Sequence, residues 1–344
     1  MASSMGGDGK HPTSRHGRRI KWLGVAVAVV VALYTAGWFY VGNLLEEQAR
    51  RVLASARESG VEADCTNLRA HGYPFRIGLF CDSISIEQSG RDVVIAAGAF
   101  RSAAQVYNPA RIVAELDAPL TVSLPDLPYD IDIGAHWEGL RASARLATPV
   151  PSRLSLEGTT FRAEATRPGG RRVPLVSAGR LELHMRARDT DADFAARFAD
   201  LVIDRSLLGE RTLPAANGDL DFTMTDGVAF LAEGAASLRG RSGEIRALNL
   251  TLAEDTGLSV NGPVSVGDDG LVSAQLSLTI RNPERLAAVM GEAVPEAREQ
   301  IETALSGFAS MAADDGRTPP LPVRIDRGEV RIGFIPVGRI PPLD

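Results

Sequence analysis

The first long apolar stretch of the chain is residues 22–41, which carry no formal charge. Twenty helical residues rise roughly 30 Å, which matches the hydrocarbon core of a membrane. Aromatic rings stand at both ends, Trp22 at one and residues 38–40 at the other, where amphipathic rings prefer the membrane interface. The pattern predicts a transmembrane helix over residues 22–42.

A second pattern of helical period follows the apolar stretch. Apolar residues recur at helical spacing from Leu44 to Ala56, and most charged residues lie on other faces. Gly60 is expected to end this helix. We predict a helical stalk over residues 43–60 that carries the rest of the chain off the membrane.

Residues 61–344 alternate between apolar and polar positions in short segments, the pattern of strands buried on one face. Gly and Pro separate the segments, as in a meander of antiparallel strands. The predicted strands up to residue 203 are 61–70, 75–86, 91–100, 111–124, 130–146, 154–165, 180–188 and 193–203. The sequence therefore predicts a mainly β fold in which one large antiparallel domain follows a transmembrane helix.

The last third of the chain adds two helices to this pattern. Strands are predicted over 245–253, 258–266 and 271–280, and a β-hairpin over 323–334 with an extended tail after it. Asn282 and Pro283 are typical of a helix start, as is Pro295. We therefore expect C-terminal helices near 283–292 and 295–311.

The two cysteines of the chain are Cys65 and Cys81. They are equally distant from position 73, inside the turn signal His71-Gly72-Tyr73-Pro74. In a hairpin centred there they would face each other on neighbouring strands, so we predict a disulfide. The alternative is two free buried thiols.

Charge is distributed unevenly along the chain. Residues 1–21 hold five basic residues and one acidic residue, a net charge of +4. The formal net charge of the whole chain is −6, so the remainder carries −10. The basic segment predicts a cytoplasmic tail, so the bulk of the chain is expected on the outer side. The alternative is a cleaved signal peptide, but the long apolar run and the bulky residues 38–40 do not suit a cleavage site. An acidic remainder argues against nucleic-acid binding.

Few residues suggest catalytic or metal chemistry. His71, His136 and His184 have no metal-binding partner at helical or hairpin spacing. No lysine follows Lys21, which excludes Schiff-base and P-loop chemistry from the β-rich part. Pairs of aspartates two residues apart, which on a strand share a face, could bind calcium or act in acid–base chemistry, but solvated charge explains them better: Asp130/Asp132, Asp191/Asp193 and Asp219/Asp221. We expect no catalytic site, no metal and no cofactor.

The turn motif Gly72-Tyr73-Pro74-Phe75-Arg76 has a stiff backbone, because proline fixes its own φ and restricts the residue before it. We interpret it as hairpin geometry with an aromatic lid on the sheet. The alternative is a docking site near the membrane. Arg76 could contact a phosphate or carboxylate, but a solvated arginine explains it better.

The anchor, this motif with Cys81 after it, and the ending Gly328-Glu-Val-Arg-Ile-Gly333-Phe-Ile-Pro336-Val-Gly338-Arg-Ile-Pro341-Pro342-Leu343 resemble the bacterial family named domain of unknown function 2125. The resemblance implies a protein anchored in the inner membrane, with a periplasmic domain and no assigned activity. Residues 245–292 also resemble, more weakly, the AsmA-like envelope proteins, which carry long sheets with an apolar concave face and are linked to lipid traffic.

These observations predict a non-enzymatic, single-pass inner-membrane protein of envelope biogenesis or lipid handling, whose partners are membrane lipid and other envelope proteins. The alternatives are a structural partner of an envelope complex and a hydrolase that uses a carboxylate pair. The sheet can fold on itself as a sandwich or barrel, the more common arrangement of soluble β proteins. If it curls only partly, its apolar face forms a groove for an acyl chain. The predicted lipid-facing residues are Leu154, Leu156, Leu181, Leu183, Leu276, Leu278 and Ile280.

Overall fold

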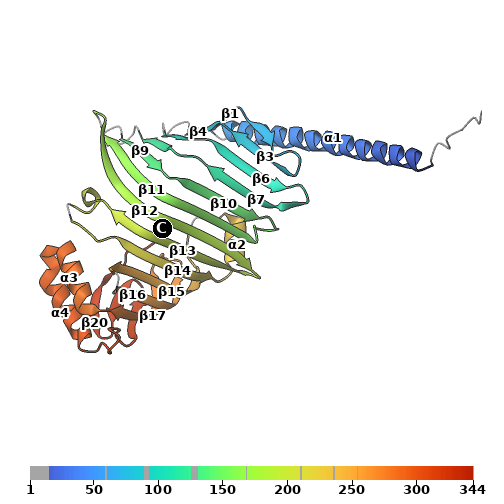
Figure 1. The fold of residues 1–344 in the computed structure, drawn as a ribbon. Coiled ribbons are helices and arrows are strands. Elements are labelled where there is room, and N and C mark those ends of the chain that lie inside the picture. Colours follow the sequence, from blue (N-terminus) through green and yellow to red (C-terminus); the bar gives the residue numbers. More distant parts are fainter. Residues whose placement is uncertain are drawn as a thin grey trace, which may run out of the picture.

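The computed structural model describes residues 15–58, 60–88, 93–124, 131–167, 169–209, 211–234, 237–253 and 255–343. Most of the predicted basic tail and Asp130 therefore lie outside the described residues. The described part of the molecule consists of one long helix, one sheet, three shorter α-helices and two 3-10 helices (Arg205–Leu207 and Pro295–Ala297) (Figure 1).

Helix α1 (Arg15–Glu58) joins the predicted anchor and the predicted stalk without a break. It is long and apolar enough to cross a membrane, and little of its apolar stretch is buried in the molecule. Gly60 ends the helix as expected: it has φ +80° and its N–H donates to the carbonyl of Arg57.

All strands belong to one antiparallel sheet of 20 strands, so the mainly β prediction is confirmed. The first ten are short: β1 (Val61–Thr66), β2 (Arg69–His71), β3 (Arg76–Cys81), β4 (Ser83–Gln88), β5 (Val93–Ala97), β6 (Phe100–Gln105), β7 (Asn108–Leu116), β8 (Leu120–Leu124), β9 (Ile131–His136) and β10 (Gly139–Arg145). The others are β11 (Arg153–Arg167), β12 (Arg171–Arg188), β13 (Asp191–Ile203), β14 (Ala216–Met224), β15 (Ser242–Ala253), β16 (Thr256–Val266), β17 (Val272–Arg281), β18 (Leu321–Asp326), β19 (Glu329–Ile332) and β20 (Ile335–Arg339).

The short strands are long strands broken in the middle. For example, the first half of β11 pairs with β10 and its second half with β9. At the break between β9 and β10, the Trp137 indole N–H donates to the carbonyl of Leu116 at 2.8 Å. The predicted strands 111–124 and 130–146 are therefore each two strands, since residues at the break leave the ladder.

The sheet stays open. Its order runs as a meander to β20, and Figure 1 shows β1 and β4 far from β20 on opposite sides of a twisted, curved sheet. The predicted extended tail is β20, which pairs with β19. The sheet is therefore neither a sandwich nor a closed barrel, and one of its faces curves inward.

Helices α3 (Pro283–Ala293) and α4 (Arg298–Ala309) confirm the two predicted C-terminal helices. Leu286 of α3 packs in a core cluster with Leu252, Ile280 and Leu321 of the sheet. Helix α2 (Gly227–Glu233) was not predicted from the sequence. Figure 1 shows α1 projecting from one end of the molecule and α3 and α4 at the other.

The disulfide between Cys65 and Cys81 is present, with 5.3 Å between the Cα atoms. The predicted register is wrong, however. Cys65 pairs with Ile84, and Cys81 pairs with Phe100 of β6, so the cysteines are not directly opposed in a hairpin. Asn67, with φ +55°, breaks the first strand between β1 and β2 and brings the two cysteines together at the break.

Candidate functional site: an exposed apolar groove

Apolar side chains form a band across the middle of the sheet. Residues directly paired in antiparallel strands project from the same face. Leu183 of β12 pairs with Leu156 of β11 and with Ala196 of β13. Leu156 also pairs with Ala142 of β10, and Ala196 with Leu220 of β14. The band thus crosses five strands without a polar residue.

A second row runs parallel to the first, two residues away along each strand. Leu154 of β11 pairs with Ala144 of β10 and Met185 of β12. Ala144 in turn pairs with Ile112 of β7, and Met185 with Phe194 of β13. Two adjacent apolar rows make this face wide enough to hold a hydrocarbon chain along or across the strands.

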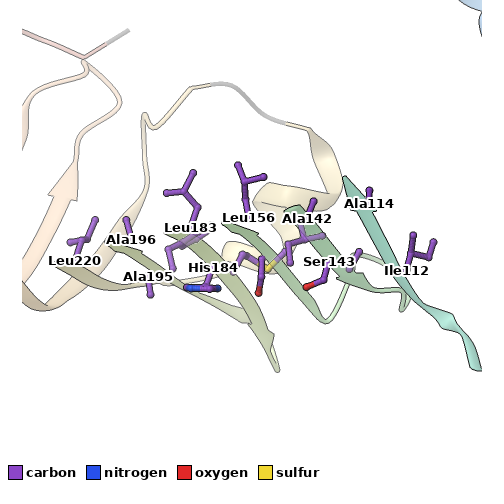
Figure 2. Close-up of a pocket in the computed structure, with 15 residues that line it drawn as sticks. Ile112, Ala114, Ala142, Ser143, Leu156, Leu183, His184, Ala195, Ala196 and Leu220 are labelled. Atoms are coloured by element: carbon purple, nitrogen blue, oxygen red, sulfur yellow. The ribbon is translucent and has the colours of Figure 1, made fainter. Parts of the chain in front are cut away.

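The band forms an open groove of about 550 Å³. Its large side chains are exposed: Leu183 is 54% exposed, Leu154 39% and Leu156 38%. Figure 2 shows Leu156, Leu183 and Leu220 projecting to one side of the sheet, and Ser143, His184 and Ala195 to the other. The groove is therefore lined by aliphatic side chains, while polar side chains of the same strands point away from it.

Helices pack over two parts of the apolar face. Helix α2 lies so close to the sheet that a Cβ on Gly227 would stand 2.6 Å from the Cβ of Ala192. Ala192 and Met224 are buried there. At the C-terminal end, Leu278 lies on the same face because the paired residues Leu220, Leu248, Val260 and Leu278 continue the first row. The groove lies beside α2 on β7 and β10–β14, away from the strands that α3 and α4 cover.

The residues predicted to face lipid have different surroundings in the structure. Leu154, Leu156 and Leu183 line the groove. Leu181 and Leu276 are half-buried on the same face outside it. Ile280 is buried in the core with Leu286, and Leu278 packs against that core. The prediction that Leu278 and Ile280 face lipid is therefore corrected, because α3 and α4 pack over them.

Several lining residues were missed by the sequence reasoning. They are mostly small or come from strands whose alternation is short: Ile112, Ala114, Ala142, Ala144, Met185, Phe194, Ala196 and Leu220. Alanine gives little contrast in an apolar–polar alternation. The apolar–polar alternation in residues 139–145 could have indicated Ala142 and Ala144. Alternation shows which face of a strand is apolar, but not which strands lie next to it in the sheet.

The opposite face carries a charged network centred on Asp193, which is buried. Its carboxylate accepts hydrogen bonds from Thr223 Oγ1 and Arg246 Nη1, both at 2.9 Å, and from Arg186 Nη2 at 3.2 Å. Arg246 also pairs with Asp221. The predicted aspartate pairs are thus brought together, with an arginine between the two carboxylates.

The electrostatics of this network do not suit a general acid. Burial raises the pKa of Asp193, but hydrogen bonds from Thr223 and Arg246 and the charges of Arg246 and Arg188 outweigh it and leave the pKa below its usual value. A catalytic acid at neutral pH needs the opposite shift. Asp219, in turn, accepts a hydrogen bond from the Asn249 amide at 2.9 Å. Asp193 and Asp221 are thus held in ion pairs with arginines, and Asp219 in a hydrogen bond with a neutral amide.

The turn motif packs against α1 and not on the sheet. The Tyr73 ring makes an edge contact with Trp38 and stacks on Phe39, and its hydroxyl lies 2.8 Å from Thr35 Oγ1. The Trp38 indole N–H donates to the carbonyl of Arg76 at 2.8 Å. The expected aromatic lid on the sheet is therefore wrong: the motif holds the β domain against the anchor helix.

The histidines make ordinary contacts. His71 Nε2 lies 2.9 Å from the carbonyl oxygen of Ser102, and His184 Nε2 lies 3.6 Å from Glu182. His136 belongs to β9, where it pairs with Arg162. Among the described residues, no group of three His, Cys, Asp or Glu side chains is placed to hold a metal ion.

The profile of a protein family described as "Uncharacterized protein conserved in bacteria (DUF2125)" matches residues 38–341. The chain belongs to this family. The match covers the hairpin motif, the groove and the C-terminal helices, and it gives no support to the weaker AsmA-like resemblance. No curated protein matches the sequence.

Proposed function

We propose that this member of the DUF2125 family is a membrane-anchored lipid-handling protein, without enzymatic activity, whose β domain lies outside the cytoplasm in the periplasm of the bacterial envelope. The observation that carries the proposal is the open groove, in which Leu154, Leu156 and Leu183 face solvent on a domain joined to a helix long enough to cross a membrane. Contiguous exposed apolar surface of this kind marks a binding site.

The physical chemistry of the groove favours an acyl chain. Each methylene moved from water to an apolar surface gains about 0.8 kcal/mol. The groove offers aliphatic side chains and no ionisable group on its apolar side, so it supplies contacts for a chain and none for a headgroup. A lipid would therefore lie with its tails on the band and its headgroup at or beyond the groove's edge.

The test is site-specific photo-crosslinking in the full-length protein in its membrane. A benzophenone amino acid replaces Leu183, which lies in the groove, and in a matched variant it replaces Val202, which is 40% exposed near the C-terminal end of β13. Mass spectrometry of the crosslinked peptides should find lipid attached at position 183 and none at 202. Equal capture at both positions, or none at 183, would refute the groove.

A second candidate function is a structural partner of an envelope complex. It is favoured by strand β20, which pairs with β19 on one side and follows the fully exposed Phe334. A free sheet edge with exposed apolar side chains can accept a strand of another protein. Charge placed on that edge, as in Val337→Lys, should abolish such a complex and leave lipid capture at position 183 unchanged.

A further inference from the structure

Two neighbouring turns of the sheet expose aromatic side chains beside α1. Phe75, in the β2–β3 turn, is 70% exposed, and Tyr107, in the β6–β7 turn, is 77% exposed. The backbone N–H of Val106 donates to the carbonyl of Phe75 at 3.1 Å, so the two turns lie side by side. We call residues 73–75 and 106–107 the aromatic rim.

Contacts with α1 fix the level of the rim relative to the membrane. Tyr34 donates to the carbonyl of Pro74, and Thr35 contacts Tyr73. Both residues belong to the apolar stretch 22–41, and Tyr34 stands four residues, roughly 6 Å, closer to its centre than Trp38. A helix that spans the membrane therefore carries the rim into the interfacial layer, where aromatic rings are favoured.

An arginine row lies next to the rim on the face opposite the groove. Arg111 of β7 pairs with Arg145 of β10, Arg145 with Arg153 of β11, and Arg153 with Arg186 of β12. Arg76 of β3, directly after Phe75, projects from the same face. All five side chains are exposed.

Like charges placed directly opposite each other destabilise a sheet unless anions lie between them. Arg186 pairs with Asp193. In the described part of the chain, no carboxylate forms an ion pair with Arg111, Arg145 or Arg153. The row therefore presents guanidinium groups that suit the bidentate recognition of phosphate.

We propose that the aromatic rim and the arginine row dock onto the membrane that α1 crosses, with the rim in the interfacial layer and the row on the phosphates of anionic phospholipid headgroups. The same edge joins this surface to the groove, because each of three arginines has an apolar neighbour in sequence on the groove face: Ile112 beside Arg111, Ala144 beside Arg145 and Leu154 beside Arg153. The row and the groove lie on opposite faces of the same strand ends. The tails of a lipid whose phosphate is bound at the row are therefore separated from the groove by the thickness of the sheet.

The rim is tested by spin-label depth measurement on the full-length protein in vesicles of phosphatidylglycerol and phosphatidylethanolamine. The introduced thiol of Tyr107→Cys can be labelled alone, because Cys65 and Cys81 are bonded. Collisions with oxygen, which dissolves in the membrane, should relax this spin label efficiently. A water-soluble nickel complex should relax it little. Val202→Cys, at an exposed apolar position at the far end of β13, should be open to nickel. Equal nickel access at the two sites overturns the rim.

The row is tested by charge reversal with a matched pair. Arg111→Glu with Arg145→Glu should lose the shielding of the label at position 107. Arg324→Glu with Arg331→Glu, another exposed and directly opposed arginine pair, on β18 and β19, should keep it. Arg111→Gln with Arg145→Gln should show a smaller loss in the same direction, and circular dichroism establishes that each variant is folded. Equal behaviour of the two reversed pairs overturns the row.

Lipid composition and salt give an independent readout. In phosphatidylcholine vesicles, and in 1 M salt where the screening length is about 3 Å, the shielding at position 107 should be reduced in the parent protein and already absent in the Arg111/Arg145 reversal. A label that is immobile but open to nickel would mean that a protein partner covers the rim, which overturns the proposal. Lipid capture at position 183 is a separate measurement, so the groove can stand if the rim fails.

Discussion

At the scale of single residues, the disulfide between Cys65 and Cys81 links the chain across the break between β1 and β2. Cys65 belongs to β1 and Cys81 to β3, and these strands are not paired with each other. The bond therefore adds a connection that the backbone hydrogen bonds of the sheet do not supply. Because the bond lies close to α1, it stabilises the segment that carries the hairpin motif.

We expect Cys65→Ala and Cys81→Ala each to lower the free energy of unfolding by about 3 kcal/mol, because the bond closes a loop of 16 residues and restricts the unfolded chain. The double variant should lose little more than either single variant, since one bond is shared. Denaturant unfolding under non-reducing conditions measures this, and additive losses would contradict it.

Asp193 makes stability depend on pH. Its pKa is lowered in the folded protein, so the carboxylate stabilises the fold above the usual carboxyl pKa of 3.8, and this contribution disappears as the pH falls through the lowered value. Asp193→Asn should cost about 1–3 kcal/mol at pH 7 and flatten the acid side of the stability profile. Asp326→Asn, at the exposed β18–β19 turn, serves as the control. It should change neither the stability at pH 7 nor the acid side of the stability profile.

At the scale of elements, the same apolar face serves two purposes. Under α3 and α4 its side chains are a core, with Ile280, Leu286 and Leu321 buried. On β7 and β10–β14, beside α2, the same rows lie open. The difference arises from where helices pack, because the alternation in the strands is alike in both places.

This division predicts two different costs for the same kind of change. Leu286→Ala should destabilise the protein by about 2–4 kcal/mol, because it leaves a cavity in a packed core. Leu183→Ala, at an exposed position, should change stability by less than about 0.5 kcal/mol. Thermal unfolding of the two variants compares them, and an equal loss for both would mean that the groove is a core.

At the scale of the whole molecule, α1 and the sheet meet through the hairpin motif and through Glu46, whose carboxylate accepts from the N–H of Ala70 at 2.7 Å. The β domain is therefore held close to the end of the apolar stretch. With α1 spanning a membrane, as we propose, the domain that carries the groove stays close to lipid, unlike a freely diffusing domain.

We expect the basic N-terminal segment to lie in the cytoplasm and the C-terminus outside it. A reporter enzyme active only outside the cytoplasm, fused after Asp344, should be active, and the protein should fractionate with membranes. A fusion active only in the cytoplasm would reverse the orientation. A soluble mature protein beginning near Trp38 would mean that the apolar stretch is removed.

Much of the architecture could be read from local patterns. A run of 20 uncharged residues, period-two alternation and Asn282-Pro283 each act through neighbours in the sequence, so they predicted α1, the β class and the start of α3. The disulfide followed from the presence of two cysteines near one turn, although its register did not. These features depend on properties that each segment carries by itself.

Only the tertiary structure decided which parts of the apolar face are covered. Leu183 and Ile280 look alike in sequence, each in an alternating strand, yet one is exposed and the other is buried under α3. The arginine row likewise joins residues from four strands whose neighbours depend on register. The physical reason is that alternation fixes the face of a side chain, whereas strand order, strand breaks and helix packing arise from contacts between residues far apart in the chain.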